Sequence, residues 1–284
     1  MDLETVVDVA LPRTRGELPD PLAGDAFLAG GTWMFSVPQT GVRRLVDLTT
    51  LGWPALTVSA DGLEIAATCT FAELVAFAGG DPRATEDTRC RWPALSLLRP
   101  CCDALRGSFK VQHAATVGGN LCLALPAAPM AALATALDGV CVVWTPEGGE
   151  RHVPAASFVL GERETVLRPG EVLRSVVLPG SALAARTAFR QESLAPLGRS
   201  AALLVARADA DGAFVLTITA STPAPVVVRL RGVPSRHELA AALHAAVPAA
   251  GYHDDVHGDP AWRAQLTALM AEELRAELAG PAAR

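Results

Sequence analysis

Lysine is almost absent from this chain of 284 residues. Lys110 is the only lysine, and the remaining basic side chains are arginines scattered along a sequence with a formal net charge of -6. A protein that binds nucleic acid neutralises phosphates with a clustered basic surface. The sequence contains no such cluster, so we expect no nucleic acid among its partners.

The sequence also lacks metal-ligand motifs and a secretory signal. Its six cysteines form no C-x-x-C pair and have no histidines at metal-ligand spacing, so we do not expect this chain alone to ligate zinc or an iron–sulfur cluster. The acidic start at residues 1–4 is unlike a signal peptide, and together with the unpaired cysteines it predicts a cytoplasmic protein. The longest uncharged stretch, residues 121–137, contains Pro126 and Pro129, which predicts a buried helix after a loop and no membrane span.

Several common catalytic and nucleotide-binding motifs are missing as well. Neither the dinucleotide-binding G-x-G-x-x-G nor the phosphate loop G-x-x-x-x-G-K-[ST] occurs, and neither G-x-S-x-G nor H-E-x-x-H is present. The six histidines are scattered, and each is more typical of a surface or structural position. No set of side chains suggests a catalytic mechanism by itself, which favours chemistry supplied by a bound organic cofactor.

Two glycine pairs are the most informative feature that the sequence does contain. Gly30-Gly31 and Gly118-Gly119 each follow an apolar, strand-like run and precede a small polar residue. Each pair could turn the backbone sharply and present free N–H groups to an anion. Two such turns meeting in space would hold a diphosphate. Ordinary tight turns are the alternative for each pair taken alone.

The length and the hydrophobic content of 50% predict a large core and about two domains. Thr70 and Glu73 have the spacing of a capping box ahead of a helix that ends near Gly79. Helices and strands alternate irregularly, which favours an antiparallel or mixed sheet. The predicted strands cover 6–9, 26–29, 44–48, 63–67, 140–144 and 172–178. Further helices are predicted within 93–105, where Pro100 must bend or interrupt the helix, and near 130–137.

A new block is expected after Pro179-Gly180. Its predicted strands cover 201–208, 214–220 and 226–230, and its first predicted helix covers 237–246. A final helix is predicted to begin at Pro260, with Asp259 as its cap, and to stop at Gly280-Pro281. One face of this helix should pack in the core through Leu266, Leu269, Met270, Leu274 and Leu278.

The order of several segments resembles the FAD-binding, or medium, subunit of the molybdenum hydroxylases, the family of xanthine dehydrogenase, aldehyde oxidoreductase and carbon monoxide dehydrogenase. The most specific of them is Thr116-Val117-Gly118-Gly119-Asn120-Leu121, which matches the family motif T-[IV]-G-G-N-L. The other matching segments are 28–32, 45–48, 62–70, 167–173 and 177–179. The resemblance extends over nearly the whole chain.

The resemblance implies an α+β protein. Residues 1–179 would form a two-lobed FAD-binding domain of the vanillyl-alcohol-oxidase or PCMH type, with lobes at about 1–52 and 53–179. Residues 180–284 would form a small C-terminal α+β domain of the CO dehydrogenase flavoprotein type, built from an antiparallel sheet with helices.

The resemblance also implies a cofactor site and partners. FAD would be held at its diphosphate by backbone amides of both glycine motifs, and two leucines would approach the flavin ring; the residues are Ala29, Gly30, Gly31, Thr32, Trp33, Thr116, Val117, Gly118, Gly119, Asn120, Leu167 and Leu173. The chain would take electrons from the [2Fe–2S] clusters of an iron–sulfur small subunit, beside a molybdopterin-binding large subunit, and pass them to an external acceptor. Catalytic and metal-binding residues are not implied.

The chain departs from the family pattern at two positions. Leu125 and Pro129 stand where relatives carry acidic residues that bind hydroxyl groups of the cofactor. Aliphatic side chains cannot accept these hydrogen bonds. Two alternatives therefore stay open beside the electron-transfer subunit: a freestanding FAD-dependent oxidoreductase with its own small substrate, and a cofactor-free scaffold of the same fold.

Overall fold

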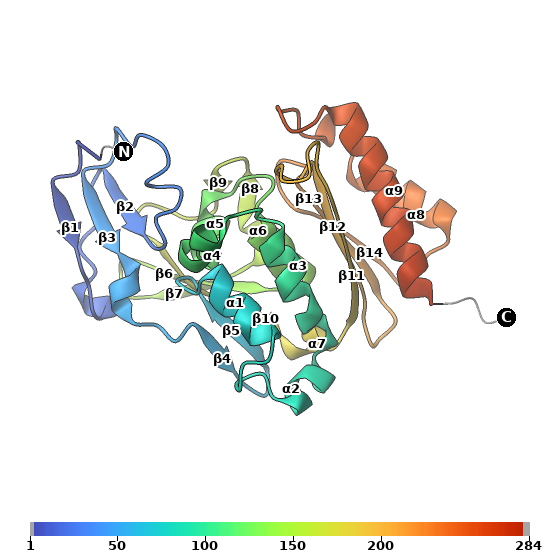
Figure 1. Ribbon diagram of the computed structural model, residues 1–284, viewed down its shortest axis with the longest axis horizontal. Helices are drawn as coiled ribbons and strands as arrows, with labels where there is room; N and C mark the ends of the chain where they lie inside the picture. The colour runs from blue at the N-terminus through green and yellow to red at the C-terminus, as the bar shows by residue number, and fades with distance from the viewer. Residues whose placement is uncertain (1–2, 281–284) are drawn as a thin grey trace.

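The structure is a computed structural model that describes residues 3–280. In this part of the chain, three sheets of three or more strands lie in a row along the long axis of the molecule, in sequence order (Figure 1). A small sheet lies at the N-terminal end, a five-stranded sheet with most of the helices lies in the middle, and a four-stranded sheet lies at the C-terminal end.

The N-terminal sheet contains β1 (Asp8–Ala10), β3 (Arg44–Asp47) and β2 (Asp25–Leu28), parallel and paired in this order. All three strands are predicted, each within two residues of its position here. The Arg44 guanidinium donates to both carboxylate oxygens of Asp25, at 2.9 and 2.7 Å, and so joins β3 to β2. This hydrogen-bonded ion pair holds the pKa of Asp25 below its usual value.

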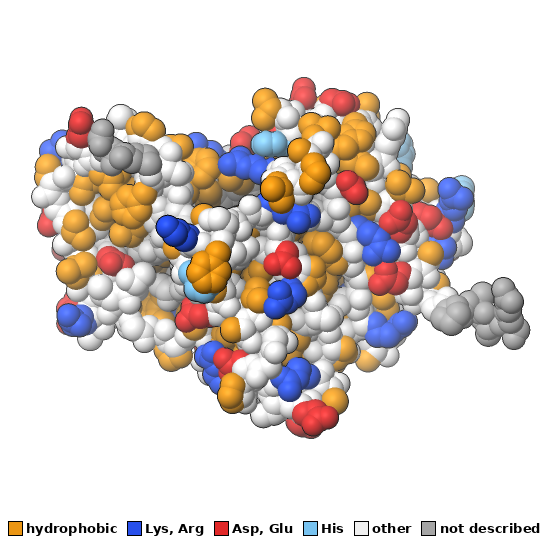
Figure 2. Space-filling model, in the orientation of Figure 1, with side chains coloured by type: hydrophobic (Ala, Val, Ile, Leu, Met, Phe, Trp, Pro, Cys, Tyr) orange, Lys and Arg blue, Asp and Glu red, His pale blue; other side chains and the backbone are white. Residues whose placement is uncertain are grey.

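The outer edge of this small sheet exposes apolar side chains. Val7, Val9 and Leu11 are 50–71% exposed along the edge strand β1. Figure 2 shows hydrophobic side chains gathered over this lobe, whereas acidic and basic side chains are mixed over the C-terminal part of the same face. A sheet of three short strands has few residues with which to bury two faces.

The central sheet is entirely antiparallel, as the irregular alternation of helices and strands predicts. Its order is β4-β5-β10-β6-β7, formed by Leu56–Val58, Gly62–Ala66, Val172–Pro179, Val140–Trp144 and Glu150–Pro154. A short hairpin beside it pairs β8 (Val159–Gly161) with β9 (Glu164–Thr165).

The first helix of the central part has the cap that its sequence predicts. In α1 (Phe71–Ala78) the Thr70 hydroxyl accepts from the Glu73 N–H, and the Glu73 carboxylate accepts from the Thr70 N–H at 2.8 Å. The predicted capping box is confirmed. The remaining helices of this part are α2 (Glu86–Arg91), α3 (Leu98–Asp103), α4 (Phe109–Ala114), α5 (Val117–Leu123) and α6 (Pro129–Ala136).

The prediction of a helix that Pro100 bends or interrupts is wrong in its detail. Residues Pro93–Leu97 form the 3₁₀ helix η3, and α3 starts directly after it at Leu98. Pro100 lies in the first turn of α3, where an N–H group has no partner inside the helix. The change of helix type therefore occurs before the proline. Shorter helical turns elsewhere are η1 (Arg15–Glu17), η2 (Leu48–Leu51), η4 (Ala155–Ser157), α7 (Gly180–Leu183) and η5 (Ala249–Gly251).

The C-terminal sheet has one strand that the sequence analysis missed. Its order is β11-β12-β13-β14, formed by Arg186–Glu192, Ala202–Ala208, Phe214–Thr219 and Val226–Leu230, all antiparallel. The missed strand is β11, whose central residues Phe189-Arg190-Gln191 lack a clear apolar alternation. In β11 only Ala188 is fully buried, so tertiary pairing with β12 rather than local pattern defines this strand.

Strand β12 packs on both faces. Leu203 and Val205 belong to the large central core, whereas Leu204 and Ala206 belong to the C-terminal core. This alternation follows from the two-residue period of a strand. Helix α6 contacts β12 from the central part, and Arg207 joins the two parts by donating to the Ala136 carbonyl at 2.7 Å.

Helices α8 (Arg236–Ala246) and α9 (Pro260–Ala279) cover the outer face of the C-terminal sheet (Figure 1). The predicted start of α9, with Asp259 as its cap, is confirmed by hydrogen bonds from two N–H groups to the Asp259 carboxylate. Leu269 was expected in the core but is 58% exposed. The buried face instead follows steps of three or four residues through Arg263, Thr267, Met270, Leu274 and Leu278. Of the predicted stop at Gly280-Pro281, Gly280 is the C-cap and Pro281 lies outside the described residues.

Candidate functional site

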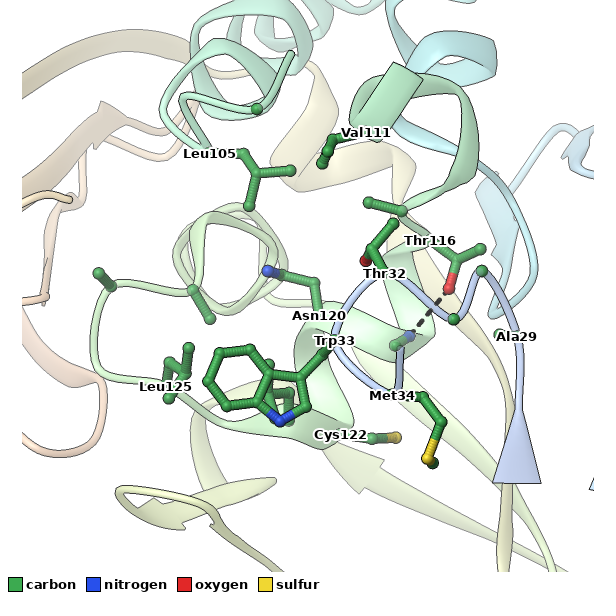
Figure 3. A pocket seen from close by; sticks show the side chains of 18 of the residues that line it. Ala29, Thr32, Trp33, Met34, Leu105, Val111, Thr116, Asn120, Cys122 and Leu125 are labelled. Carbon is green, nitrogen blue, oxygen red and sulfur yellow. Dashed lines mark hydrogen bonds between the residues drawn. The ribbon is translucent and has the colours of Figure 1, made fainter. Parts of the chain in front are cut away.

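A cleft of about 460 Å³ lies where the N-terminal lobe meets the helices of the central part. Its walls come from four segments of the chain: 27–34 after β2, 104–111 around the start of α4, 115–128 around α5, and 199–200 before β12 (Figure 3). Volumes of this order are typical of small-molecule sites. Of the predicted site residues, the cleft contains Ala29, Gly30, Gly31, Thr32, Trp33, Thr116, Gly119 and Asn120.

The first glycine pair forms a turn directly after β2. Gly31 has a φ of +68°, and the Phe35 N–H donates to the Gly31 carbonyl at 2.9 Å, which closes the turn. The N–H groups of Thr32, Trp33 and Met34 inside this turn find no acceptor within residues 3–280. Successive unpaired N–H groups on one turn form a concave site for an anion. This turn has unpaired N–H groups as the sequence analysis expects, and its contact with a diphosphate stays a prediction.

Glycine is required at both positions of this first pair. A Cβ atom on Gly30 would overlap the carbonyl oxygen of Ala114 and lie 2.6 Å from its carbonyl carbon. A Cβ atom on Gly31 would lie 2.6 Å from Cδ2 of Phe35, at a backbone conformation that favours glycine. The turn therefore packs directly against the residues that precede the second glycine motif, so the two motifs lie side by side.

The second glycine pair is not a turn but the start of α5. Thr116 is the N-cap of this helix, and its hydroxyl accepts from the Gly119 N–H at 3.1 Å (Figure 3). The Val117 N–H donates to the Cys69 carbonyl at 2.9 Å, and the Gly118 N–H donates to the Ala67 carbonyl at 2.8 Å. These amides are thus bonded inside the protein. Their predicted contact with a diphosphate stays a prediction.

Gly118 allows α5 to contact the end of β5 closely. A Cβ atom on Gly118 would lie 2.8 Å from both Cα and the carbonyl oxygen of Ala67. Val117 is 2% exposed and faces the central core, so neither residue lines the cleft. The second motif therefore positions the wall of the cleft through Thr116, Gly119 and Asn120.

Asn120 presents a donor to the cleft. Its Oδ1 accepts from the Met130 N–H at 3.0 Å, so its Nδ2 group is the one left for a ligand (Figure 3). The lining contains one charged side chain, Arg199, and neither aspartate nor glutamate. With the unpaired N–H groups of the first turn, the polar groups of the cleft are mainly donors. Such an arrangement favours an anionic ligand.

The two leucines predicted near the flavin ring do not line this cleft. Leu173 is 3% exposed and pairs with Val143 in the central sheet, and Leu167 packs against the same core. Their segment is held by Glu171, which accepts from Nε of Arg151 at 2.7 Å and from the Arg168 N–H at 2.8 Å. The Arg151 guanidinium lowers the pKa of the Glu171 carboxyl. Their role toward the ring stays a prediction.

Other residues of the cleft escaped the sequence analysis. Leu105 lines it from the segment before α4, Val111 from α4 and Cys122 from α5. Arg199 lines it from the loop ahead of β12. These positions are far apart in the sequence, and no motif marks them. Leu125, which departs from the family pattern, also faces the cleft, whereas Pro129 is buried at the first position of α6.

Two further properties concern metals and membranes. Within residues 3–280, His, Cys, Asp and Glu side chains nowhere gather in groups of three or more that could hold a metal ion. None of the helices in that range is both long and apolar enough to cross a membrane.

Solved structures with the same fold cover nearly the whole chain. A chain of quinoline 2-oxidoreductase from Pseudomonas putida 86 superposes with a TM-score of 0.76 at 22% identity, covering 98% of each chain. A chain of CO dehydrogenase from Oligotropha carboxidovorans superposes with a TM-score of 0.76 at 20% identity, covering 97% of this chain and 99% of that one. At such identities the likeness shows the fold.

Two relatives are similar in sequence. Xanthine dehydrogenase of rice, Oryza sativa subsp. japonica, is 33% identical over 84 residues, which are 28% of this chain and 6% of that protein. The 6-hydroxypseudooxynicotine dehydrogenase complex subunit alpha of Paenarthrobacter nicotinovorans is 26% identical over 181 residues, 59% of this chain and 60% of the subunit. The chain thus matches only part of either relative.

The family model described as the FAD binding domain in molybdopterin dehydrogenase matches residues 22–181. This range is more than half of the chain and includes both glycine motifs, the central sheet and every lining residue of the cleft except Arg199 and Ser200. The resemblance inferred from the sequence is confirmed, and so is the fold class. The chain belongs to the family of FAD-binding domains of molybdopterin dehydrogenases, an oxidoreductase family whose cofactor is FAD.

Proposed function

We propose that the chain is the FAD-binding electron-transfer subunit of a cytoplasmic molybdenum hydroxylase-like enzyme. It accepts electrons from the [2Fe–2S] clusters of an iron–sulfur small subunit, beside a molybdopterin-binding large subunit, and passes them to an external acceptor. The observation that carries the proposal is the turn after β2: its N–H groups are unpaired, and its residues line a cleft built mainly by the range that the family model matches.

The residues of the cleft fit the diphosphate of FAD. The N–H groups of Thr32, Trp33 and Met34 would hold the phosphate oxygens, since they are unpaired donors on one turn. Gly30 leaves no room for a side chain against Ala114, which keeps that turn in place. Asn120 and Arg199 add a neutral and a charged donor. The dianionic diphosphate is thereby held without a lysine side chain.

FAD supplies the redox chemistry when it is bound, because a flavin takes up electrons singly and gives them up in pairs. The residues of this chain bind the cofactor, orient it and exclude water from its diphosphate. The partner subunits belong to the proposal. Supporting it, one relative is named as a subunit of a dehydrogenase complex, and one structural neighbour is named as a Cu,Mo-CO dehydrogenase.

We also propose the domain division after residue 179, with the FAD-binding domain in 1–179 and the C-terminal domain in 180–284. The family match ends close to this boundary, at residue 181. Strands β11–β14 and helices α8 and α9 share a hydrophobic core of their own, built from residues between Ala188 and Leu278.

The proposal is tested by purifying the full-length chain from its native cells under mild conditions. We expect one FAD per chain, measured by chromatography of the released flavin. We also expect co-purifying polypeptides that carry [2Fe–2S] signals in electron paramagnetic resonance and a molybdopterin cofactor. Bound FAD without partners would support the freestanding flavin enzyme instead. Protein without FAD whose melting temperature does not rise on adding FAD would contradict flavin binding altogether.

A further inference from the structure

Trp33 is placed unusually for a residue of a phosphate-binding turn. Its indole projects into the cleft, between Asn120, Cys122 and Leu125 (Figure 3). Among the lining residues only Phe27 and Trp33 are aromatic. The indole is half-buried although it forms no part of either hydrophobic core of the described chain. Its large apolar surface therefore belongs to the wall of the cleft.

Two arginines lie over this indole at the outer range of a cation–π interaction. The guanidinium carbons of Arg163 and Arg199 are 5.8 and 5.9 Å from the ring centroid. These distances are close to the limit of about 6 Å for a cation–π interaction, and they exceed the van der Waals separation of stacked planes. A base that stacks on the indole must therefore displace the guanidinium on that face, and both side chains add positive charge for an anionic ligand.

The cleft offers apolar surface beside the indole. Leu125 lines the cleft near Trp33 (Figure 3), and no aspartate or glutamate lines it to accept hydrogen bonds from sugar hydroxyls. Loss of such bonds weakens the hold on a ribose or ribityl group. Stacking of a base on an aromatic side chain can compensate for this loss. Trp33 and Leu125 thus give this part of the cleft, here called the slot, one aromatic and one aliphatic side chain.

The position of Trp33 limits which ring can occupy the slot. Trp33 follows Gly31 by two residues, so their Cα atoms are at most roughly 7 Å apart. A ring that stacks on this indole must be joined to the phosphates in the same turn by a short link. In FAD the adenine is joined to its phosphate by a ribose, whereas the flavin ring is separated from its phosphate by the longer ribityl chain.

We propose that Trp33 is the adenine-stacking residue of this cleft and that it makes the site specific for adenosine diphosphate compounds. The proposal rests on the proposed function, since it concerns how the same cleft recognises FAD. Trp33 binds the base, and the turn that contains it binds the diphosphate. Leu125 adds apolar contact beside the indole, and no carboxylate lines the cleft to bind the sugar.

The test measures dissociation constants of the FAD-free full-length chain for ADP, FMN and inorganic pyrophosphate by titration calorimetry. Trp33→Leu should weaken ADP binding by about tenfold or more, and Trp33→Phe should stay within about threefold of the wild type, because a phenyl ring keeps a stacking face. Binding of pyrophosphate should not change. Phe109→Leu is the matched control: Phe109 is an aromatic side chain that is 77% exposed and lies outside the cleft.

A second measurement uses the wild type and Trp33→Phe, and it does not depend on Trp33→Leu. ADP should quench the tryptophan fluorescence of the wild type and not that of Trp33→Phe, because none of the other four tryptophans lines the cleft. Wild-type affinity for ADP in Trp33→Leu, or a loss confined to FMN, would overturn the stacking while leaving FAD binding intact. A wild-type chain that binds neither ADP nor FAD would contradict the proposed function too.

Discussion

The two glycine pairs look alike in the sequence and differ in the structure. Gly30-Gly31 closes a turn whose N–H groups are unpaired and face the cleft. Gly118-Gly119 begins α5, and its N–H groups are bonded to Ala67 and Thr116. Gly30 and Gly118 each lie where another segment of the chain comes too close for a side chain, but only the first pair leaves donors for a ligand. A glycine pair thus marks close approach, and the partner of that approach has to be found in the fold.

The partners of the two pairs differ in burial. Gly118 meets Ala67, which is 3% exposed in the central core. Gly30 meets the backbone of Ala114 at the rim of the cleft, between the small N-terminal lobe and the central part. Strain at the contact of Gly118 with Ala67 has to be absorbed by the core, whereas strain at the contact of Gly30 with Ala114 can be relieved by moving a turn. We therefore expect the two pairs to affect different properties when they are changed.

The largest effect is expected on stability from Gly118→Val. The added side chain would press on Ala67 at the end of β5, and overpacking of this kind lowers the free energy of unfolding by about 3 kcal/mol. Urea unfolding measures the change. Gly41→Val is the control, because a Cβ there has no atom within 4 Å. Equal stability of the two variants would show that α5 does not depend on this close contact.

A change at the other pair should affect the ligand. Gly30→Ala would push the turn away from Ala114, which we expect to weaken FAD binding by about thirtyfold, equivalent to about 2 kcal/mol. The free energy of unfolding should fall by less than 1 kcal/mol, since the turn lies at the surface. Fluorescence titration and urea unfolding measure the two quantities, with Gly41→Ala as the control. Loss of stability with unchanged FAD affinity would remove the distinction between the pairs.

The smallest expected effect is a dependence of stability on pH, which only the N-terminal lobe that leads to Gly30 should show. Arg44 lowers the pKa of Asp25, at the start of the strand leading to Gly30, below its usual value of 3.8. The ion pair therefore contributes stability above that value and loses it as the pH falls through the lower pKa of the folded state.

The measurement is the difference in unfolding free energy between the wild type and Asp25→Asn. It should favour the wild type at neutral pH and shrink toward zero below the folded-state pKa of Asp25. The contact of Gly118 with Ala67 involves no charged group, so the effect of Gly118→Val should stay constant over the same range. If the difference in unfolding free energy between the wild type and Asp25→Asn stayed constant over this pH range, the ion pair with Arg44 would contribute nothing to the stability of the N-terminal lobe.

Much of the fold could be predicted from local patterns. The capping box at Thr70 and the start of α9 at Asp259 and Pro260 follow from short sequence motifs with a defined geometry. Strand β11 was missed, because it is paired with β12 and buries little of its own surface. The start of α5 was missed as well, since a glycine pair within a first turn has the same sequence as a loop.

The candidate site was predictable only in part. The first motif and three positions of the second line the cleft, whereas Leu167 and Leu173 lie away from it. Arg199, Leu105 and Leu125 complete the walls from segments that no short motif connects.

By itself, the sequence determined which segments bring backbone close to backbone, because only glycine tolerates a neighbour where Cβ would stand. The near absence of lysine also led to the prediction that a phosphate group would be held by backbone amides. The tertiary structure alone decided which amides remain free. The Gly118 N–H donates to the carbonyl of Ala67, a residue 51 positions earlier in the chain. Such pairing over a long sequence separation is fixed by packing of the whole domain.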